Sequence, residues 1–352
     1  MSTDAVVIWG ELLWDRFPAA LGGAQLGGAP ANVAWHLGQA GGWAQLVTRV
    51  GDDADGRRAL AELEELVDTS LAQVDPERAT GEVTVELEAG EPRYTLHAGR
   101  AWERIACSDA VIAAIRDAGV FIYGTLAQRT AEGLAEWRRA IAAAGAGVLK
   151  VYDANLRPND RAAHVVAEAL GHADVIKLND REVGQLRGLL GCDDPIAELR
   201  ARRPCIVVVT HGAAGSTIYP AEGAPIENHP RDATRGGVNG PDLPGQRGRE
   251  SPLRNHPRDA TRGGVNGPDL PGQRGRESPL RIDIPGVPAR PGGDNVGCGD
   301  AYLALLVFGM TSGWDLAASG QIASRWAAAV AEVRGATPRF DDEWIAALLE
   351  TA

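Results

Sequence analysis

Short apolar runs alternate with longer stretches of helical periodicity through most of this chain. Such runs are typical of strands buried on both faces of a sheet, and the segments between them are long enough for helices. The predicted strands cover residues 5–10, 43–51, 120–123, 147–152, 175–178 and 205–209. The predicted helices cover residues 54–67, 109–118, 130–144, 160–170, 180–190, 300–309, 316–333 and 341–349. The alternation predicts an α/β fold with a doubly wound, mostly parallel sheet.

One part of the chain has a different pattern. Residues 81–88 alternate between apolar and polar, and residues 92–97 can return beside them after a turn at residues 89–91. Strict alternation is typical of a sheet with one solvated face. We therefore predict a small antiparallel lid that grows out of the main sheet, with elements around residues 11–26 and 81–98.

A tandem duplication interrupts the alternation. Residues 228–254 recur without a change at residues 255–281. Both copies are rich in glycine, proline and arginine, and their few apolar residues cannot offset the entropy of ordering by burial. We expect residues 228–281 to be a disordered surface insert between segments 216–219 and 281–285, which would otherwise form a hairpin. A basic tether is the functional alternative. The whole chain, residues 1–352, is otherwise predicted to be a single domain.

The composition is that of a globular protein that acts on a small molecule. The chain has 352 residues, of which 44% are hydrophobic, and a formal charge of −12. This charge opposes binding to nucleic acid or to an anionic membrane. The four cysteines are widely spaced, with neither a zinc-binding pattern nor a disulfide framework. No apolar run reaches membrane-spanning length and no signal core is present, so we expect a cytoplasmic protein.

A glycine-rich segment near the C-terminus carries the strongest candidate chemistry. It leads directly into an apolar run of good helix formers. Backbone N–H groups at a helix start lack intrahelical partners and attract anions, so the amides of Gly297, Cys298 and Gly299 can hold a phosphate. Asp300 would lie in the first turn, where its carboxylate can act as a base beside that phosphate. The structural alternative is that the glycines turn the chain and Asp300 complements the helix dipole.

A second glycine-rich segment near the N-terminus suits a polyhydroxylated ligand. Gly27 and Gly28 permit close approach, and Asn32 would lie in the first turn of a helix, where its amide can donate and accept hydrogen bonds. Asp15 would follow the first strand, at the sheet edge where ligands bind. A turn aspartate and a polar residue at a helix start are the structural alternatives. His36 is expected to pack or to face solvent rather than to catalyse.

Polar residues and glycines also follow three later strands. They are Asp153, Asn155 and Arg157, then Asn179 and Glu182, then Thr210, Gly212 and Gly215. Because the carboxyl ends of parallel strands share one edge of the sheet, this clustering predicts one common site.

Taken together, two segments resemble the two signatures of the ribokinase-like (PfkB) carbohydrate kinases. They are Gly27-Gly28-Ala29-Pro30-Ala31-Asn32 and Gly293-Asp294-Asn295-Val296-Gly297-Cys298-Gly299-Asp300-Ala301. The resemblance covers nearly the whole chain outside residues 228–281, and residues 10–15, 153–158 and 177–182 look most like bacterial fructokinases. It implies a ribokinase-like fold and ATP-dependent phosphorylation of a sugar's primary hydroxyl, with fructose preferred over ribose, 2-keto-3-deoxygluconate or a phosphorylated ketose.

The resemblance also implies roles for residues at matching positions. Asp300 takes the hydroxyl proton, and the amides of Gly297, Cys298 and Gly299 hold the transferring phosphoryl group. The implied sugar-binding residues are Asp15, Gly27, Gly28, Asn32 and Arg157. The implied nucleotide-binding residues are Asn179, Glu182, Thr210, Gly212, Gly215 and Ser324. Glu182 acts indirectly on the Mg²⁺ of the nucleotide, while Asp294 and Gly335 fall near the monovalent cation, such as K⁺, that the family often uses.

The chain departs from the family pattern at a few positions. Asn295 and Val296 stand where threonines are common, Cys298 replaces a common alanine, and Ser324 replaces an asparagine. The insert separates strands on the nucleotide side, so a sugar-binding or nucleotide-binding homologue without turnover is the alternative class, against which the retained Asp300 weighs. Lids of this kind often pair between subunits in the family, which implies a homodimer through the lid. A Rossmann dehydrogenase and a Walker-type kinase are disfavoured because their glycine motifs are missing.

Overall fold

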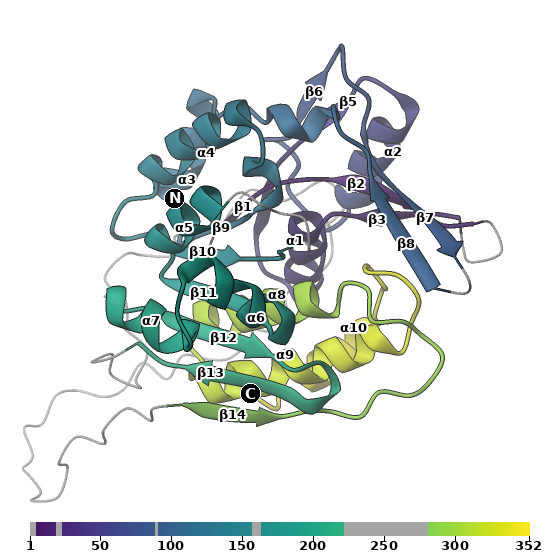
Figure 1. The fold of residues 1–352 in the computed structure, drawn as a ribbon. Helices are drawn as coiled ribbons and strands as arrows, with labels where there is room; N and C mark the ends of the chain where they lie inside the picture. Colours follow the sequence, from purple (N-terminus) through teal and green to yellow (C-terminus); the bar gives the residue numbers. More distant parts are fainter. Residues whose placement is uncertain (1–4, 19–22, 89–90, 157–162, 222–280) are drawn as a thin grey trace, which may run out of the picture.

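The computed structural model describes residues 5–18, 23–88, 91–156, 163–221 and 281–352, and it is built around an eight-stranded sheet (Figure 1). The strands lie in the order β14-β13-β12-β11-β10-β9-β1-β4. Their bounds are β1 (Val6–Trp9), β4 (Ala44–Val47), β9 (Val120–Gly124), β10 (Leu149–Asp153), β11 (Val175–Asn179), β12 (Ile206–Thr210), β13 (Gly215–Tyr219) and β14 (Ile282–Pro285). From β4 to β12 neighbouring strands are parallel, whereas β13 and β14 are antiparallel. The predicted fold class is confirmed.

Successive side chains of each central strand enter two different hydrophobic cores. On β1, Val6 and Ile8 belong to one core, while Val7 and Trp9 belong to the other. The first core includes residues of α1 (Ala29–Gln39), α2 (Ala54–Leu63), α8 (Cys298–Ser312), α9 (Leu316–Ala331) and α10 (Asp342–Leu349). The second includes residues of α3 (Asp109–Asp117), α4 (Ala131–Ala143), α5 (Ala163–His172), α6 (Asp180–Leu190) and α7 (Pro195–Arg202). Because both faces are covered, these strands are continuously apolar.

A four-stranded sheet extends from the main body at the upper right of Figure 1. Its strands lie in the order β3-β2-β7-β8, with bounds β2 (Leu13–Arg16), β3 (Ala24–Gly27), β7 (Gly81–Glu88) and β8 (Glu91–Leu96). It contains both segments predicted to form the lid, and we refer to it as the lid. A small core of Leu13, Val83 and Val85 supports one face. The alternation of residues 81–88 reflects this single buried face.

The predicted strand at residues 43–51 is wrong in one respect, because it is two strands in different sheets. β4 ends at Val47, and β5 (Arg49–Gly51) pairs with β6 (Gln73–Asp75) in a separate two-stranded sheet. An ion pair of 3.0 Å between Arg49 and Asp75 holds β5 against its partner. Residues 43–51 include polar residues, among them Thr48 and Arg49 at the break, but polar residues alone do not show that a strand changes its pairing partner.

Other helix boundaries differ by a few residues, and the pattern missed one helix. α2 ends at Leu63 rather than at Val67, and α7 was not predicted. The N-cap of α7, Asp194, accepts hydrogen bonds from the amides of Ile196 and Ala197, but few of its residues are buried, so its apolar periodicity is weak. Short 3₁₀ helices are η2 (Ala101–Arg104), η3 (Leu126–Gln128) and η4 (Gly212–Ala214).

The duplicated insert lies in the sequence between β13 and β14, the two strands at one edge of the main sheet. β13 and β14 pair in antiparallel register, as predicted for the segments that flank the insert. Residues 228–280 of that insert lie outside the described residues. In the part of the chain that the structure describes, we find no helix long and apolar enough to span a membrane.

Candidate active site

The site is organised by the first turn of α8. Gly297 is its N-cap in the left-handed region, with φ of 76° and no side-chain cap. The amide of Ala301 donates to the carbonyl of Gly297 over 2.8 Å, so the helical hydrogen bonds begin there. Earlier amides in the turn have no intrahelical acceptor. A Cβ on Gly297 would lie 2.6 Å from Cβ of Ala336, which leaves this position to glycine. The turn therefore leaves its first amides without intrahelical acceptors, and their binding of an anion stays a prediction.

Asp300 lies in that turn and is joined to the N-terminal segment by a hydrogen bond. Nδ2 of Asn32, in α1, donates to Oδ2 of Asp300 over 2.8 Å. The side-chain oxygen of Asn32, Oδ1, is buried without a partner among the described residues. Gly28 caps α1 with φ of 103°, and a Cβ there would lie 2.4 Å from the carbonyl oxygen of Glu11. The structure thus brings the two glycine-rich segments together.

A buried ion pair that the sequence analysis did not assign lies next to Asp300. Nζ of Lys177, on β11, donates to Oδ1 of Asp153, at the end of β10, over 3.0 Å. Asp153 was predicted only as part of the common edge, and Lys177 was missed. Its signal was available, since a lysine within the apolar strand Val175–Asn179 needs a buried partner.

These charges shift the titration of the groups around them. Burial, and then the charge of Asp153, raise the pKa of Asp300 to about 7, although Lys177 and the hydrogen bond from Asn32 oppose this. Burial lowers the pKa of Lys177, but Asp153, Asp300 and Glu182 outweigh it, and the pKa lies above its usual value. Lys177 is therefore a cation, while Asp300 can exchange a proton near neutral pH.

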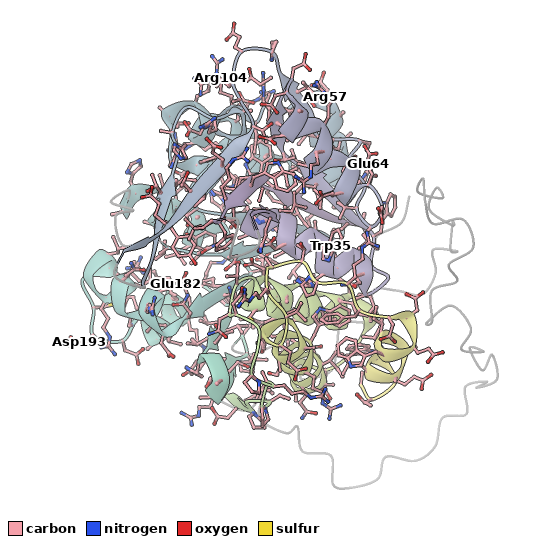
Figure 2. All side chains as sticks on the ribbon, turned by 90° about the vertical axis from the view of Figure 1, so that its right-hand side faces the viewer. Trp35, Arg57, Glu64, Arg104, Glu182 and Asp193 are labelled. Carbon is pink, nitrogen blue, oxygen red and sulfur yellow. The ribbon has the colours of Figure 1, made fainter. Side chains whose placement is uncertain are left out.

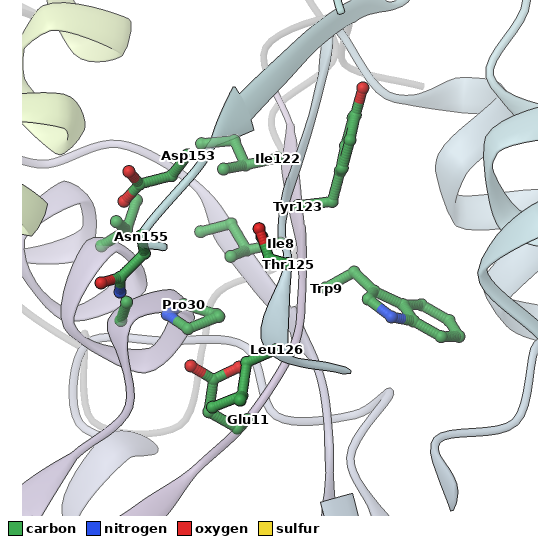
Figure 3. Close-up of a pocket in the computed structure, with 13 residues that line it drawn as sticks. Ile8, Trp9, Glu11, Pro30, Ile122, Tyr123, Thr125, Leu126, Asp153 and Asn155 are labelled. Carbon is green, nitrogen blue, oxygen red and sulfur yellow. The ribbon is translucent and has the colours of Figure 1, made fainter. Parts of the chain in front are cut away.

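Figure 3 shows a small cavity at the carboxyl ends of β1, β9 and β10. Its volume of about 20 Å³ is enough for roughly one water molecule. Asp153 and Asn155 line it, and Glu11 lines it from the loop after β1. Oδ2 of Asp153 is buried without a partner among the described residues, and Asn155 adopts a left-handed conformation with φ of 41°. The polar edge predicted from the sequence thus borders a cavity.

Asn179 and Glu182 form a capping box at the start of α6. Glu182 is labelled in Figure 2. Oε2 of Glu182 accepts from the amide of Asn179, and Oε1 accepts from the amide of Leu156, each over 2.8 Å. Burial raises the pKa of Glu182, which Lys177 opposes. The described residues contain no cluster of three or more acidic, histidine or cysteine side chains for a metal. The arrangement fits indirect contact with a metal that arrives with its ligand, because each carboxylate oxygen can accept a further hydrogen bond from a metal-bound water.

The three predicted nucleotide-loop residues lie at the same edge, one strand further along. Thr210 ends β12 in register with Asn179 on β11. Gly212 and Gly215 have φ of 57° and 108° and form the turn into β13. A Cβ on Gly215 would lie 2.1 Å from the carbonyl oxygen of Ile284.

Ser324 is buried on α9, which packs against β13 and β14. The turn is tied to the helix that carries Asp300, because Oγ of Ser216 and the hydroxyl of Tyr302 are 2.7 Å apart. The positions assigned to the nucleotide therefore flank the positions assigned to the sugar and the transferring phosphoryl group.

Asp15 lies on lid strand β2, inside the segment 11–26 that was predicted to form the lid, and not directly after the first central strand, where its side chain was expected. It is on β2, opposite Gln25 on β3, and its carboxylate abuts Gly27, where a Cβ would lie 2.3 Å from Oδ2 of Asp15. The chain leaves β1 through the loop around Glu11 before entering β2, which the apolar pattern of residues 5–15 does not reveal. Asp15 and Gly27 therefore lie together at the lid. Arg157 lies outside the described residues.

Asp294 and Gly335, assigned to a monovalent cation, are joined directly. Oδ2 of Asp294 accepts from the amide of Gly335 over 3.2 Å, and Oδ1 accepts from the amide of Val296 over 3.0 Å. A Cβ on Gly335 would lie 2.7 Å from Oε1 of Gln25, in the lid. Gln25 of the lid therefore lies against the loop after α9, and Asp294 joins that loop to the segment before α8.

Cys298 contributes its backbone rather than its thiol to the site. Burial, with smaller effects from Asp294 and Asp300, raises the pKa of Cys298 to about 11. A thiol with that pKa is neutral near pH 7 and is a weak nucleophile. The replacement of the family's common alanine therefore leaves the amide-lined turn unchanged in character.

His36 is packed in the interior, as expected, and it holds the loop around Ala336 that lies against Gly297. Nδ1 of His36 accepts from Nε1 of Trp326 over 3.1 Å, so Nε2 carries the proton and donates to the carbonyl of Ala336 over 2.8 Å. Trp35, on the same helix, donates to the carbonyl of Pro338 (Figure 2). One face of α1 thus fixes residues 336–338 against the start of α8.

This fold and site define a class of enzyme. A doubly wound sheet with a lid, an amide-lined helix start and an adjacent carboxylate suit a phosphotransferase with a hydroxyl group as acceptor, because phosphoryl transfer depends on positioning and on charge stabilisation. The profile described as pfkB family carbohydrate kinase matches residues 22–233. The chain belongs to this family, and it is a sugar kinase.

Similar proteins agree with this assignment. Fructokinase-1 of Zea mays is 29% identical over 236 residues, which cover 61% of this chain and 73% of the relative. A fructokinase of Klebsiella pneumoniae is 32% identical over 205 residues, covering 54% of this chain and 64% of the relative. The fold is shared with a fructokinase of Xylella fastidiosa with bound ATP, at a TM-score of 0.73, 18% identity and 99% coverage of both chains.

Proposed function

We propose that this enzyme transfers the γ-phosphoryl group of ATP to a primary hydroxyl of fructose. The observation that carries the proposal is the 2.8 Å hydrogen bond between Asn32 and Asp300. It joins the segment assigned to the sugar to Asp300, the acidic residue in the first turn of α8. Fructose is favoured among sugars because the relatives include fructokinases of Zea mays and Klebsiella pneumoniae.

In the proposed reaction, Asp300 accepts the proton of the hydroxyl as its oxygen attacks the γ-phosphorus. The amides of Gly297, Cys298 and Gly299 donate to the phosphoryl oxygens, on which negative charge is spread in the transition state. Asp15, Gly27, Gly28 and Asn32 hold the sugar, together with Arg157. The lid excludes water from the site, which limits hydrolysis of ATP.

The nucleotide is assigned to the edge formed by β11, β12 and β13. Its proposed contacts are Asn179, Glu182, Thr210, Gly212, Gly215 and Ser324. Mg²⁺ bound to ATP would neutralise phosphate charge, with Glu182 acting through metal-bound water because both its oxygens already accept amide hydrogen bonds. Asp294 and Gly335 are proposed to lie beside a monovalent cation, and activation by K⁺ relative to Na⁺ would test this assignment.

Two proposals concern the protein in its setting. β3 and β8 are the outer strands of the lid, and unpaired strand edges can join two subunits, so we propose a homodimer through the lid. Light scattering after size exclusion tests it.

The described cysteines are free, as is usual in the reducing cytoplasm, where we place the enzyme. Cell fractionation tests that placement.

The decisive experiment is a coupled ADP-release assay against a panel of sugars. We expect fructose to give the highest kcat/KM, and Asp300→Asn to lower kcat by about 10²- to 10⁴-fold, the usual contribution of a general base. Asp109→Asn is the control, since Asp109 is an exposed acid in the first turn of α3 and shares only the dipole-complementing role. Turnover unchanged in Asp300→Asn would remove the assigned base. A higher kcat/KM for ribose or a phosphorylated ketose would replace fructose but keep the class.

A further inference from the structure

The ammonium group of Lys177 is buried with spare hydrogen-bonding capacity. Its side chain is 6% exposed, and among the described residues Asp153 is its one hydrogen-bond acceptor, at 3.0 Å. An ammonium has three donors. A buried charge is costly unless it is paired and hydrogen-bonded, so two unused donors in a buried site call for a further partner.

The chain is shaped to bring this ammonium to the first turn of α8. A Cβ on Gly299 would lie 3.0 Å from Nζ of Lys177. Gly299 is helical and is absent from the positive-φ glycines, so the backbone does not require glycine there. Glycine weakens a helix relative to alanine. The missing side chain instead gives Lys177 access to the amides that the proposed function assigns to the phosphoryl group.

We propose that Lys177 is a catalytic residue that contacts the transferring phosphoryl group, and that Asp153 positions it. The inference rests on the proposed function. The sugar oxygen forms a bond to the γ-phosphorus while its proton passes to Asp300. The bond from that phosphorus to the β–γ bridging oxygen breaks, and ADP leaves with the electron pair. Lys177 keeps its protons and donates to the phosphoryl oxygens, where charge is spread.

The local charges explain why a cation is needed there. Asp153, Asp300 and Glu182 all act on Lys177 electrostatically; Asp153 and Glu182 are buried, and Asp300 is half-buried. Without a cation, these carboxyl groups would repel the phosphates of ATP. The amides at the start of α8 carry only partial positive charge. Lys177 supplies a full charge at the same place.

The experiment compares Lys177→Met with Lys150→Met, which removes the other lysine of the chain. Lys150 pairs with Asp174 over 3.3 Å at the start of β10, away from the carboxyl edge. We measure kcat with fructose, the affinity for ADP, and the affinity for ADP with aluminium fluoride and fructose, a mimic of the transferring group. We expect Lys177→Met to lose about 10²- to 10³-fold in kcat and in affinity for the mimic, with affinity for ADP changed less than about threefold. Lys150→Met should match the wild type.

Two further variants separate catalysis from folding. Lys177→Arg keeps the charge and should recover part of kcat. Asp153→Asn combined with Lys177→Met removes both charges, so no lone buried charge remains to unfold the protein. The inference is overturned if the double variant is folded and retains kcat within about threefold of the wild type, or if Lys177→Met loses affinity for ADP and for the mimic equally. A wild-type enzyme without turnover on any sugar would instead overturn the proposed function.

Discussion

Asn32 and Asp300 show how residues far apart in the sequence become one chemical unit. Each follows a left-handed glycine, Gly28 or Gly297, which starts the helix that carries it. The two helices pack against each other, and the amide of Asn32 then donates to the carboxylate over 2.8 Å. This hydrogen bond favours the ionised form of Asp300, while burial and Asp153 favour the protonated form.

The opposing effects on the pKa of Asp300 predict how turnover depends on pH. Burial and Asp153 raise the pKa of Asp300 to about 7, and a general base must be ionised to accept a proton. We expect kcat at saturating substrates to fall about tenfold per pH unit below pH 7 and to level off above it. Initial rates between pH 5.5 and 8.5 measure this.

Asp153→Asn provides the comparison. It removes a nearby negative charge, so the pKa of Asp300 should fall and the acidic limb of the profile should move to lower pH. A flat profile in the wild type, or a limb that moves to higher pH in Asp153→Asn, would contradict the assignment of Asp300 as the titrating base.

His36 predicts a loss of stability in acid. Burial lowers its pKa to about 4, whereas an unfolded histidine titrates near 6.5. Folding therefore disfavours the protonated form, and stability that is present above pH 6.5 is lost as the pH falls towards 4. The difference of about 2.5 pH units corresponds to about 3 kcal/mol in the free energy of unfolding. Urea unfolding between pH 7.5 and 4.5 measures it.

The histidine contribution is isolated by substitution. His36→Gln should be less stable at pH 7.5 but should lose less stability on acidification than the wild type. His172→Gln, at an exposed histidine in the last turn of α5, should follow the wild-type slope. Equal slopes for His36→Gln and the wild type would mean that His36 does not titrate as described.

At the scale of elements, α8 is bounded by left-handed glycines with different surroundings. Gly297 and Gly313 have φ of 76° and 86°. A Cβ on Gly297 meets Ala336 at 2.6 Å, whereas a Cβ on Gly313 meets nothing within 4 Å. The first end is therefore shaped by its contact with the loop held by α1. The second end requires glycine for its backbone alone.

The different surroundings of Gly297 and Gly313 predict that alanine substitutions at these two positions have different effects on stability and on kcat. Gly313→Ala should cost about 1–2 kcal/mol in the free energy of unfolding, through the left-handed conformation. Gly297→Ala should cost about 1–3 kcal/mol more through overlap, and it should lower kcat because it displaces the amide-lined turn. Thermal unfolding and ADP release measure both. Equal stability and kcat in the two variants would show that the contact with Ala336 is not required.

At the scale of the molecule, the duplicated insert is joined to a sheet edge that is complete without it. β13 and β14 pair from Gly215 with Pro285 to Ile218 with Ile282. We expect deletion of residues 255–281, the second copy, to leave kcat and KM within about threefold of the wild type, because a longer or shorter connection changes loop-closure entropy only slightly. The ADP-release assay measures this. Inactivity of a folded deletion variant would mean that the insert contributes to the site.

Much of the architecture was predictable because buried strands and helices have recognisable patterns of apolar residues in the sequence. The central strands and the alternating segment 81–88 were found, apart from the break after Val47 and the weakly apolar α7. Asp300 and Asn32 were found because glycine and polar residues at a helix start are locally recognisable. Lys177 stands out locally as a lysine within an apolar strand, but its partner, Asp153, is on another strand, and no local pattern identifies a partner across strands.

The amino-acid sequence by itself determined the α/β class, the doubly wound order of elements and the two glycine-rich helix starts, since these depend on local periodicity and backbone freedom. Only the tertiary structure decided that Asn32 touches Asp300, that the carboxylate of Asp15 abuts Gly27 and that Lys177 lies against Gly299. The physical reason is that burial, charge pairing and pKa depend on which segments become neighbours, and packing of the whole chain sets those neighbours.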